Sequence, residues 1–400
     1  MLYAIPSLIA LVWFALLVVT RREMRLMPKL RGVLPTDTAR PRVLAVVPAR
    51  DEAEVVDWCI KALLIQQGVE LHVLLYDDRS TDQTAELADA LAEANKDRLT
   101  VIHGAHEPPE GWCGKPHALT RALELFGYNV ATGTLLRRDP PDYLLFVDAD
   151  VVLRPTAVAE MAQLIHAKRA GLASALPHLI CKTFWEKVAG PSIGALITAR
   201  HKPSSVNRVN NAAVLANGQF MMLTPEAYAR VGGHAGVRKE VLEDVALARN
   251  IKQSGIPVVL ADGQKVVATR MYSSLAELFQ GWVKNAFPLV GGTVRQAVTY
   301  ALLALWLSWT PLACLMASIP AWINEDVGLA LVLSCGWLIP LMVQMRLRKV
   351  GGQSPLYAFF APVGAIIVAA VLGKATWKAT RGSPVTWKGR SYVDGTGVQK

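Results

Sequence analysis

The sequence predicts an α/β domain fixed to a membrane by one N-terminal helix and two to three C-terminal helices. Three observations lead to this fold class. Short apolar runs alternate with helical patterns from residue 41 to about residue 267. A charge-free run occupies residues 2–20, and three more apolar runs follow residue 293. With 52% hydrophobic residues among 400, the chain is too apolar for an ordinary soluble enzyme.

The first apolar run predicts a membrane anchor, which we place at residues 1–22. The run is long enough to cross a bilayer as a helix, and Arg21, Arg22 and Arg25 follow it at once. A cleaved signal peptide would carry basic residues before the run and a small-residue cleavage site after it, and neither is evident. A helix buried in a soluble core is the alternative, which the basic cluster disfavours.

Residues 41–292 form the predicted α/β domain. Apolar runs of strand length lie at 43–47, 71–76, 99–103, 143–147 and 219–223. Between them, apolar residues recur at helical spacing over 54–66, 84–94 and 156–168. Such alternation is typical of a mostly parallel sheet covered by helices.

Residues 293–373 hold the C-terminal apolar helices. The runs at 298–323 and 327–345 predict a membrane-spanning hairpin, with an acidic loop at 324–326 and a basic loop at 346–349. Basic loops stay on the cytoplasmic side of a membrane. We therefore expect a multi-pass protein of the cell (inner) membrane whose α/β domain is cytoplasmic.

The third C-terminal run, at 356–372, poses a problem of parity. A full span would place the basic tail, residues 374–400, on the outer side. The run also contains Pro362 and Gly364 and follows Pro355. We favour a re-entrant or interfacial segment over a third span.

The positive charge lies at the ends of the chain. The net charge is +10, of which residues 1–40 contribute +4 and residues 344–400 contribute +8, so the remainder carries −2. A nucleic-acid binder would carry its basic patch on the folded domain. This distribution excludes a nucleic-acid partner and favours contact with a lipid bilayer.

The cysteines exclude two kinds of site. There are five, with no close CxxC pair, and two of them lie in apolar runs. Neither a zinc site nor a disulfide framework is supported.

The run at 143–147 leads into two carboxylates, Asp148 and Asp150. Side chains two residues apart leave a strand on the same face, so the pair is expected to converge. Carboxylates held close repel each other, and Mg²⁺ or Mn²⁺ relieves this while also binding a diphosphate. A solvated turn at the end of a strand is the alternative, because such pairs are common.

Two further polar clusters follow strands, at residues 46–52 and 74–81. Ligands of an open α/β sheet bind outside the carboxyl ends of its strands, so the three clusters predict one crevice. Asp78 is suited to accept hydrogen bonds from a nucleobase or ribose, and Arg50 to face phosphate. Ser80, Thr81 and Asp82 are interpreted as helix caps.

The clusters carry a resemblance to a known family. Pro48-Ala-Arg-Asp-Glu52, Asp77-Asp-Arg-Ser-Thr81, Gly111-Trp-Cys-Gly-Lys-Pro-His-Ala-Leu119, Asp148-Ala-Asp150 and Glu243-Asp244 stand in the order found in family 2 glycosyltransferases, which have the Rossmann-like GT-A fold. The resemblance covers roughly residues 41–290. Four more segments resemble the membrane-bound branch that glycosylates carotenoids, hopanoids or ceramide: Asn217-Gly-Gln-Phe220, Gly232-Gly-His234, Thr269-Arg-Met-Tyr272 and Trp387-Lys-Gly-Arg-Ser-Tyr392.

The resemblance implies roles for named residues. The donor would be a nucleotide-diphosphate sugar, a UDP-sugar above all, bound by Pro48, Arg50, Glu52, Asp78, Lys115 and Asp148. Asp148 and Asp150 would hold Mg²⁺ or Mn²⁺. Contacts to the diphosphate or to a membrane lipid acceptor would come from Gly218, Gln219, Glu243, Gln280, Trp282 and Lys284.

Asp244 would be the catalytic general base. It lies near the start of an amphipathic helix that ends at Gly255, so its carboxylate can project into the crevice. Favourable charge at a helix N-terminus is the alternative for Glu243 and Asp244.

One departure from the family bears on the product. Polymerising members carry a QxxRW box, whereas this chain reads Gln280-Gly-Trp-Val-Lys-Asn285 and lacks the arginine. Transfer of a single sugar to a hydroxyl or carboxyl of a lipid, with inversion, is therefore expected. The alternatives are a processive polysaccharide synthase and a transporter or scaffold with a degenerate nucleotide domain. The apolar runs contain almost no charged residues of the kind that mark a transport pathway, which disfavours a transporter.

Two other patterns carry less weight. Residues 190–194 satisfy GxSxG, but they lie in a helical stretch with no strand before them, which excludes a nucleophile elbow. Residues 183–200 and 274–290 mix aromatic residues with cations, as helices in a membrane interface do. Packing of these two helices on the sheet is the equal alternative.

Overall fold

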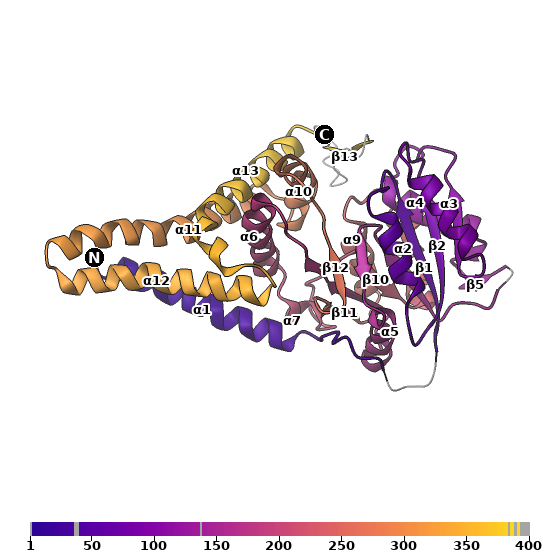
Figure 1. Ribbon diagram of the computed structural model, residues 1–400, viewed down its shortest axis with the longest axis horizontal. Helices are drawn as coiled ribbons and strands as arrows, with labels where there is room; N and C mark the ends of the chain where they lie inside the picture. The colour runs from indigo at the N-terminus through magenta and orange to yellow at the C-terminus, as the bar shows by residue number, and fades with distance from the viewer. Residues whose placement is uncertain (1, 36–39, 137, 383–384, 388–389, 393–400) are drawn as a thin grey trace.

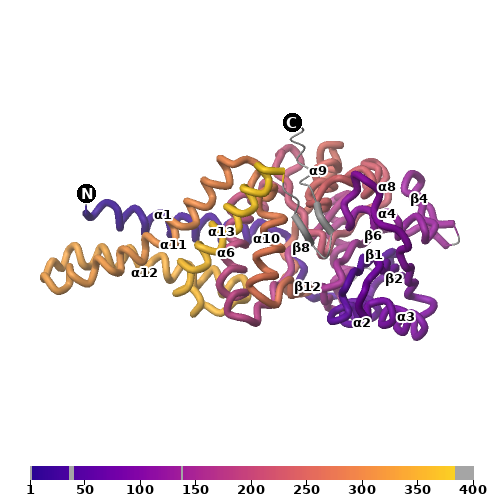
Figure 2. Tube along the Cα trace, turned by 90° about the horizontal axis from the view of Figure 1, so that it is seen from above, coloured from indigo at the N-terminus to yellow at the C-terminus, as the bar shows by residue number. Residues whose placement is uncertain are grey.

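The computed structural model describes residues 2–35, 40–136, 138–382, 385–387 and 390–392. An α/β domain forms one end of the molecule, and long apolar helices extend from it at the other (Figure 1). Helices α6 (Phe184–Arg200), α10 (Leu275–Leu289) and α13 (Ala361–Thr380) lie between the two parts in both views (Figures 1 and 2).

The main sheet has seven strands in the order β11-β8-β10-β6-β1-β2-β3. Strand β1 pairs in parallel with β2 and β6, whereas β10 runs antiparallel between β6 and β8. All five strands expected from the sequence are present: β1 (Arg42–Ala49), β2 (Glu70–Asp77), β3 (Leu99–His103), β6 (Tyr143–Val147) and β10 (Phe220–Leu223). Two more, β8 (Leu172–Leu176) and β11 (Val258–Asp262), were not expected.

Helices cover both faces of this sheet. Alternate residues of β1 point to opposite sides, and Val43 and Val47 belong to one buried cluster while Leu44 and Val46 belong to the other. The first cluster includes residues of α2 (Val56–Leu64), α3 (Thr84–Ala94) and α5 (Ala157–Lys168). The second includes residues of α4 (Gly114–Leu125), α8 (Pro225–Arg230) and α9 (Glu243–Gln253).

A three-stranded sheet borders the carboxyl edge of the main sheet. It joins β7 (Val151–Leu153) to β12 (Val267–Thr269), which also pairs with β9 (His178–Leu179). Because β7 directly follows the Asp148–Asp150 segment, this pairing brings Thr269 close to the carboxylates. The smaller elements are β4 (Tyr128–Asn129), β5 (Thr134–Leu135), α7 (Pro203–Val206), η1 (Gly233–Val237), η2 (Pro355–Phe360), β13 (Val385–Trp387) and β14 (Arg390–Tyr392).

Four helical segments of the described chain are long and apolar enough to cross a membrane. They are α1 (Ala4–Leu26), α11 (Val294–Ile323), α12 (Val327–Val350) and the segment Pro355–Thr380, which combines η2 with α13. Helix α1 packs along the α11–α12 hairpin, where Trp13 Nε1 donates to the Leu307 carbonyl at 3.2 Å. This fits the expected one N-terminal and two to three C-terminal helices, and α1 continues four residues past the expected boundary at 22.

Both ends of α13 contact helices that adjoin the α/β domain. At its start, Phe360 meets Phe184 of α6 with ring centroids 5.1 Å apart, and Gly364 lies against Ser192 of α6. Towards its end, Ala375 shares a buried cluster with Leu278 of α10. These contacts favour a re-entrant or interfacial α13, which remains a prediction. The helix runs to Thr380, seven residues into the expected tail, part of which lies outside the described residues.

The two expected interface helices, α6 and α10, pack mainly on α13 and on each other. Ile193 of α6, Phe287 of α10 and Val368 of α13 belong to one buried cluster, separate from the two clusters of the sheet. Phe184 and Trp185 at the start of α6 are each 38% exposed. The GxSxG segment lies inside α6, which confirms that it is not a nucleophile elbow.

Candidate active site

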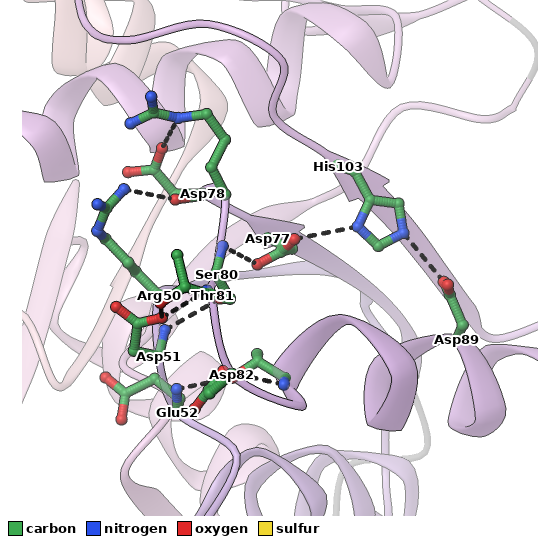
Figure 3. A network of polar contacts seen from close by, with 12 residues as sticks. Arg50, Asp51, Glu52, Asp77, Asp78, Ser80, Thr81, Asp82, Asp89 and His103 are labelled. Carbon is green, nitrogen blue, oxygen red and sulfur yellow. Dashed lines mark hydrogen bonds and ion pairs between the residues drawn. The ribbon is translucent and has the colours of Figure 1, made fainter.

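The loops after β1 and β2 are joined by a network of hydrogen bonds (Figure 3). Arg50 donates through Nη1 to the Asp78 carbonyl at 2.9 Å. The Asp51 carboxylate accepts from the backbone N–H of Thr81 at 2.7 Å, and the Asp51 N–H donates to Ser80 Oγ at 3.0 Å. Each polar side chain therefore fixes the backbone of the other loop.

Two residues of these loops have a left-handed backbone. The φ angles of Asp51 and Arg79 are 52° and 58°. Such angles are costly for residues other than glycine and gather at functional sites, where surrounding bonds hold them. Here the network of Figure 3 holds Asp51 on both sides.

The expected capping of α3 is wrong for Ser80 and Thr81. Both bind Asp51 instead, and the residue that precedes α3 makes no side-chain cap. Asp82 does help to start the helix, because its carboxylate accepts from the Thr84 N–H at 3.0 Å. The sequence could not separate the two outcomes, since a short hydroxyl side chain serves a cap or a facing loop equally well.

The expected donor residues of β1 and β2 meet at this edge. Pro48 pairs with Tyr76 across the two strands, and Arg50 binds the loop that carries Asp78. Asp78 is buried, and one carboxylate oxygen lies 3.7 Å from Arg79 Nε. Glu52 is half-buried, and its N–H donates to Thr84 Oγ1 at 2.8 Å.

Lys115 stands at the centre of the carboxylates. It lies in the first turn of α4, with Nζ 2.6 Å from Asp148 Oδ1 and 2.9 Å from Glu243 Oε1. Burial opposes its charge, but Asp148, Glu243 and Asp244 outweigh burial and raise the pKa of Lys115. Lys115 is therefore a fixed cation that joins the β6 edge to α9.

Glu243 and Asp244 are the first two residues of α9. The Asp244 carboxylate accepts from the Gly218 N–H at 2.8 Å and from the Val245 N–H at 2.7 Å. Burial and the neighbouring Glu243 charge raise the pKa of Asp244 to about 7, against the effect of Lys115 and these two hydrogen bonds. A carboxyl group with such a pKa can take up and release a proton near neutral pH.

Gly218 allows this close approach because it has no side chain. A Cβ at this position would lie 3.0 Å from Lys115 Nζ and 3.3 Å from both Asp244 Cβ and Glu243 Oε1. The absence of a Cβ therefore leaves room for the cluster.

Asp148 and Asp150 lie in a turn and not on the strand itself. Strand β6 ends at Val147 and β7 begins at Val151, so the expected convergence does not come from strand geometry. Asp148 binds Lys115, whereas Asp150 Oδ2 accepts from Thr269 Oγ1 at 3.0 Å. Burial, followed by the charges of Asp148 and Glu52, raises the pKa of Asp150 to about 7.

A chain of hydrogen bonds orients Asp150. Gln219 Nε2 donates to Thr269 Oγ1 at 3.3 Å, and Asn217 Nδ2 donates to Gln219 Oε1 at 3.2 Å. Gln219 thus reaches the site through Thr269. The sequence pattern does not single out Thr269 as a functional residue, although it begins the Thr269-Arg-Met-Tyr272 segment that resembles the lipid-glycosylating branch.

Asp148 and Asp150 are suited to hold Mg²⁺ or Mn²⁺ together with the phosphates of a bound diphosphate. Asp150 Oδ1 is buried and has no hydrogen-bond partner within the described part of the chain. That same part contains no group of three or more His, Cys, Asp or Glu side chains suited to a metal. Mg²⁺ is usually held by one or two carboxylates together with substrate phosphates and water, so two protein ligands are sufficient.

The three residues expected on α10 differ in their positions. Lys284 is close enough to Glu243, Lys115 and Asp148 to feel their charges, and burial lowers its pKa. Trp282 contacts Tyr272, with ring centroids 6.4 Å apart, and lines an apolar cavity between α6, α10 and α13. Gln280 is exposed, and no contact found among the described residues joins it to the site.

His234 is a core residue. It is 1% exposed, and its Nδ1 lies 2.7 Å from the Tyr228 hydroxyl. Its ring also meets Phe146 edge-on, with centroids 4.6 Å apart. Burial lowers the pKa of His234 to about 3, so the ring is neutral.

Comparison with known proteins gives a family and relatives. A family model described as "Glycosyltransferase like family 2" matches residues 41–284. The chain is 28% identical over 364 residues to 4,4'-diaponeurosporenoate glycosyltransferase of Staphylococcus aureus strain USA300, with 87% of each chain covered. The protein of the same name from strain MRSA252 is 27% identical over 353 residues, again with 87% of each chain covered.

A solved structure shares the fold. The mannosyltransferase PcManGT from Pyrobaculum calidifontis, solved in complex with GDP-Man and Mn²⁺, is similar with a TM-score of 0.51 and 19% identity. The similarity covers 92% of this chain and 99% of that one. It extends past the α/β domain into the C-terminal helices.

The family model spans 244 of the 400 residues, which is more than half of the chain. Its range contains the carboxylates, Lys115 and the first turn of α9 described above. The chain therefore belongs to the family 2 glycosyltransferases: it is an enzyme with a GT-A fold that acts on a nucleotide sugar.

Proposed function

We propose that this enzyme transfers one sugar, with inversion, from a nucleotide-diphosphate sugar to a hydroxyl or carboxyl group of a membrane lipid. A UDP-sugar is the proposed donor. One observation carries the proposal: the Asp244 carboxylate and the Lys115–Asp148 pair stand together at the edge of the sheet, beside helices that form an apolar cavity.

The loops after β1 and β2 would bind the nucleoside. Asp78 and Glu52 offer carboxylates to the base and ribose, and Arg50 holds the Asp78 backbone in place. These loops are held by bonds within the protein, so little ordering is required when the donor binds.

Lys115 and Lys284 would bind the diphosphate. Both cations face the carboxylates Asp148 and Glu243. A diphosphate entering here would exchange part of these ion pairs for its own oxygens. Val283 stands where the QxxRW box of polymerising members has its arginine, and Lys284 is the nearest cation.

Asp148 and Asp150 would hold Mg²⁺ or Mn²⁺, which supplies positive charge to the departing diphosphate. Thr269 keeps Asp150 turned towards that position. The similar mannosyltransferase was solved with Mn²⁺, a property of that protein which agrees with this proposal.

Asp244 would act as the general base. It would remove the proton from the acceptor as the acceptor oxygen attacks C1 of the sugar, while the bond from C1 to the diphosphate oxygen breaks on the opposite face. One displacement of this kind inverts the anomeric carbon. The Gly218 and Val245 N–H groups fix the carboxylate for this role.

The acceptor would approach between α6, α10 and α13. The cavity there has a volume of only about 10 Å³, so the three helices would have to move apart to admit a lipid. Its lining is apolar and aromatic and belongs to Ile193, Leu196, Ile197, Trp282, Ala286, Leu289, Val290, Val368, Val371 and Leu372. Trp282 contacts Tyr272, with ring centroids 6.4 Å apart, and Tyr272 is close enough to Asp150 to feel its charge, which connects this lining to the charged site. The Staphylococcus aureus relatives are named for a carotenoid acceptor, 4,4'-diaponeurosporenoate, which supports an apolar acceptor here.

The test is a transfer reaction with the purified full-length protein. The protein in detergent is incubated with UDP-glucose, Mg²⁺ or Mn²⁺ and a lipid extract, and UDP release and lipid products are followed by mass spectrometry. We expect lipids that carry one hexose with the β-configuration. Products with many sugars would show a processive synthase, and no release of nucleoside diphosphate from any nucleotide sugar tested would contradict the proposal.

A further inference from the structure

A basic concavity lies beside the end of α1 that the sequence leads us to expect on the cytoplasmic side. Its volume is about 450 Å³, and it is lined by Arg25, Leu26, Met27, Pro28, Lys29, Arg31 and Lys168. Four of these seven residues are cationic. We call this site the basic niche. Figure 1 shows α1 running from the far tip of the apolar bundle to the α/β domain, so the niche lies where the two parts meet.

The backbone that forms the niche is firmly held. Residue Lys29 makes a parallel bridge with Asp262, the Leu30 N–H donates to the Asp262 carbonyl at 2.9 Å, and the Asp262 N–H donates to the Pro28 carbonyl at 2.8 Å. On α1 itself, the Glu23 carboxylate accepts from the Ser204 N–H and from Ser204 Oγ, both at 2.9 Å. The end of α1 is thus attached to the domain by two separate sets of bonds.

A buried carboxylate fixes the next segment of the niche. Glu160 is 8% exposed and accepts from the backbone N–H groups of Arg31, Gly32 and Val33 at 2.5, 2.9 and 3.1 Å. Thr156 Oγ1 donates to the same carboxylate at 2.7 Å. Its oxygens are therefore engaged with donors other than the basic side chains.

The positive charge of the niche is not balanced within the described chain. Arg25, Lys29, Arg31 and Lys168 are all exposed, and none of the ion pairs found among the described residues includes any of them. A concave surface lined by one sign of charge concentrates the field and attracts counter-ions. The niche is therefore suited to an anion.

The position of the niche along α1 indicates the source of that anion. The charge-free part of the helix ends at Thr20, and Arg25 lies five residues further, about 7–8 Å along the axis. The polar layer of a bilayer extends about 5–8 Å beyond the hydrocarbon on each side. If Thr20 marks the end of the hydrocarbon, the niche begins at the depth of lipid phosphates.

We propose that the basic niche binds the phosphate of an anionic phospholipid headgroup. This rests on the membrane placement of α1 expected from the sequence and on the lipid acceptor of the proposed function, but it concerns a site distinct from the sugar-transfer site. Binding would hold the end of α1, and with it the α/β domain, at a fixed height over the bilayer. Lys29 and Lys168 line the niche from different elements, one from the segment after α1 and one from the last turn of α5.

The test compares two double variants of the full-length protein with the same loss of charge. In K29Q/K168Q the niche loses two cations. In the control R98Q/R230Q two exposed arginines of the α/β domain are lost, and neither has an ion pair among the described residues. Native mass spectrometry of the detergent-solubilised proteins measures the binding of added phosphatidylglycerol, phosphatidylcholine and inorganic phosphate.

We expect the wild-type protein and the control to bind phosphatidylglycerol equally and in preference to phosphatidylcholine. K29Q/K168Q should bind phosphatidylglycerol roughly thirtyfold more weakly, since each cation near an anionic surface contributes about a factor of five. Equal binding by K29Q/K168Q and the control would overturn the proposal. Inorganic phosphate bound as tightly as phosphatidylglycerol would also overturn it, because the niche would then be a site for free anions.

Sugar transfer in detergent separates this proposal from the proposed function. K29Q/K168Q should retain wild-type transfer, which shows that it is folded. A failure to detect any transfer by the wild-type protein would count against the proposed function alone, because lipid binding is measured without a nucleotide sugar.

Discussion

The backbone N–H of Gly218 donates a hydrogen bond of 2.8 Å to the side-chain carboxylate of Asp244. This bond joins the segment before β10 to the first turn of α9, and Lys115 lies against both. The geometry holds the proposed base in one orientation. Its consequences for catalysis can be tested by substitution.

Replacement of Asp244 by Asn should reduce sugar transfer by about 10²- to 10⁴-fold, the usual contribution of a general base. The amide oxygen can still accept from the Gly218 N–H, so the loop should keep its position, although the bond from the Val245 N–H is lost. Initial rates of UDP release give the effect, and calorimetry should show unchanged binding of the nucleotide sugar. Near-normal turnover of the variant would remove Asp244 from the role of base.

The rate should depend on pH near neutrality. The pKa of Asp244 is raised to about 7, and the base must be ionised to accept a proton. At a saturating donor concentration, turnover should fall about tenfold for each pH unit below this pKa and level off above it. Saturation matters because the pKa of Asp150 is also raised to about 7, so donor binding weakens in the same range. A flat profile would show that the acceptor reacts without a base, as an ionised carboxyl group can.

Replacement of Gly218 by Ala should lower transfer by about tenfold to a hundredfold. The added methyl group would lie 3.0 Å from Lys115 Nζ and 3.3 Å from Asp244 Cβ, so both must move by a few tenths of an ångström. Small displacements of catalytic groups have effects of this size. The melting temperature should change little, because shifts of a few tenths of an ångström are enough to make room for the methyl group. Gly194, with open space around its Cβ position, gives a matched control for the same substitution.

Replacement of Thr269 by Val should weaken Mn²⁺ binding by about ten- to a hundredfold, as loss of a supporting hydrogen bond does at other metal sites. Valine has the shape of threonine but cannot donate to Asp150 Oδ2 or accept from Gln219. Titration of Mn²⁺ by electron paramagnetic resonance in the presence of UDP measures the affinity. Thr269→Ser keeps the hydroxyl and should bind Mn²⁺ almost normally. Equal affinities of the Val and Ser variants would show that Thr269 does not position Asp150.

A reporter at the C-terminus should face the same side of the membrane as the α/β domain. Both ends of α13 contact α6 and α10, which adjoin that domain, so the chain returns to the side from which it entered. A reporter inserted at residues 324–326, between α11 and α12, is the control and should face the opposite side. A C-terminal reporter on the same side as the reporter at residues 324–326 would establish three full C-terminal spans.

Much of the α/β domain could be predicted because parallel strands that are buried on both faces consist of continuous apolar runs. The run that became β6 reads Tyr-Leu-Leu-Phe-Val, and helices cover it on both faces. Strand β8 was missed because Leu-Ala-Ser-Ala-Leu has no β-branched residue, and alanine is common in helices. Its place in the sheet comes from pairing with β10 and β11, which are distant in sequence.

Part of the candidate site could also be predicted from local sequence patterns. Asp148, Asp150, Lys115 and Asp244 stand at the ends of recognisable elements, so their types and order could be read from the chain. That Ser80 binds Asp51 and does not cap α3 could not be read, because the choice depends on a loop that begins about thirty residues earlier.

The sequence by itself determined the classes of structure: an apolar anchor, an α/β domain and an ordered set of polar residues at strand ends. These are local properties of composition and periodicity. Only the tertiary structure decided that Thr269 orients Asp150, that Gly218 holds Asp244, and that Lys29 and Lys168 share one concavity. Each of these pairs is separated by tens of residues or more, and its members meet because hydrophobic burial folds the sheet and helices together.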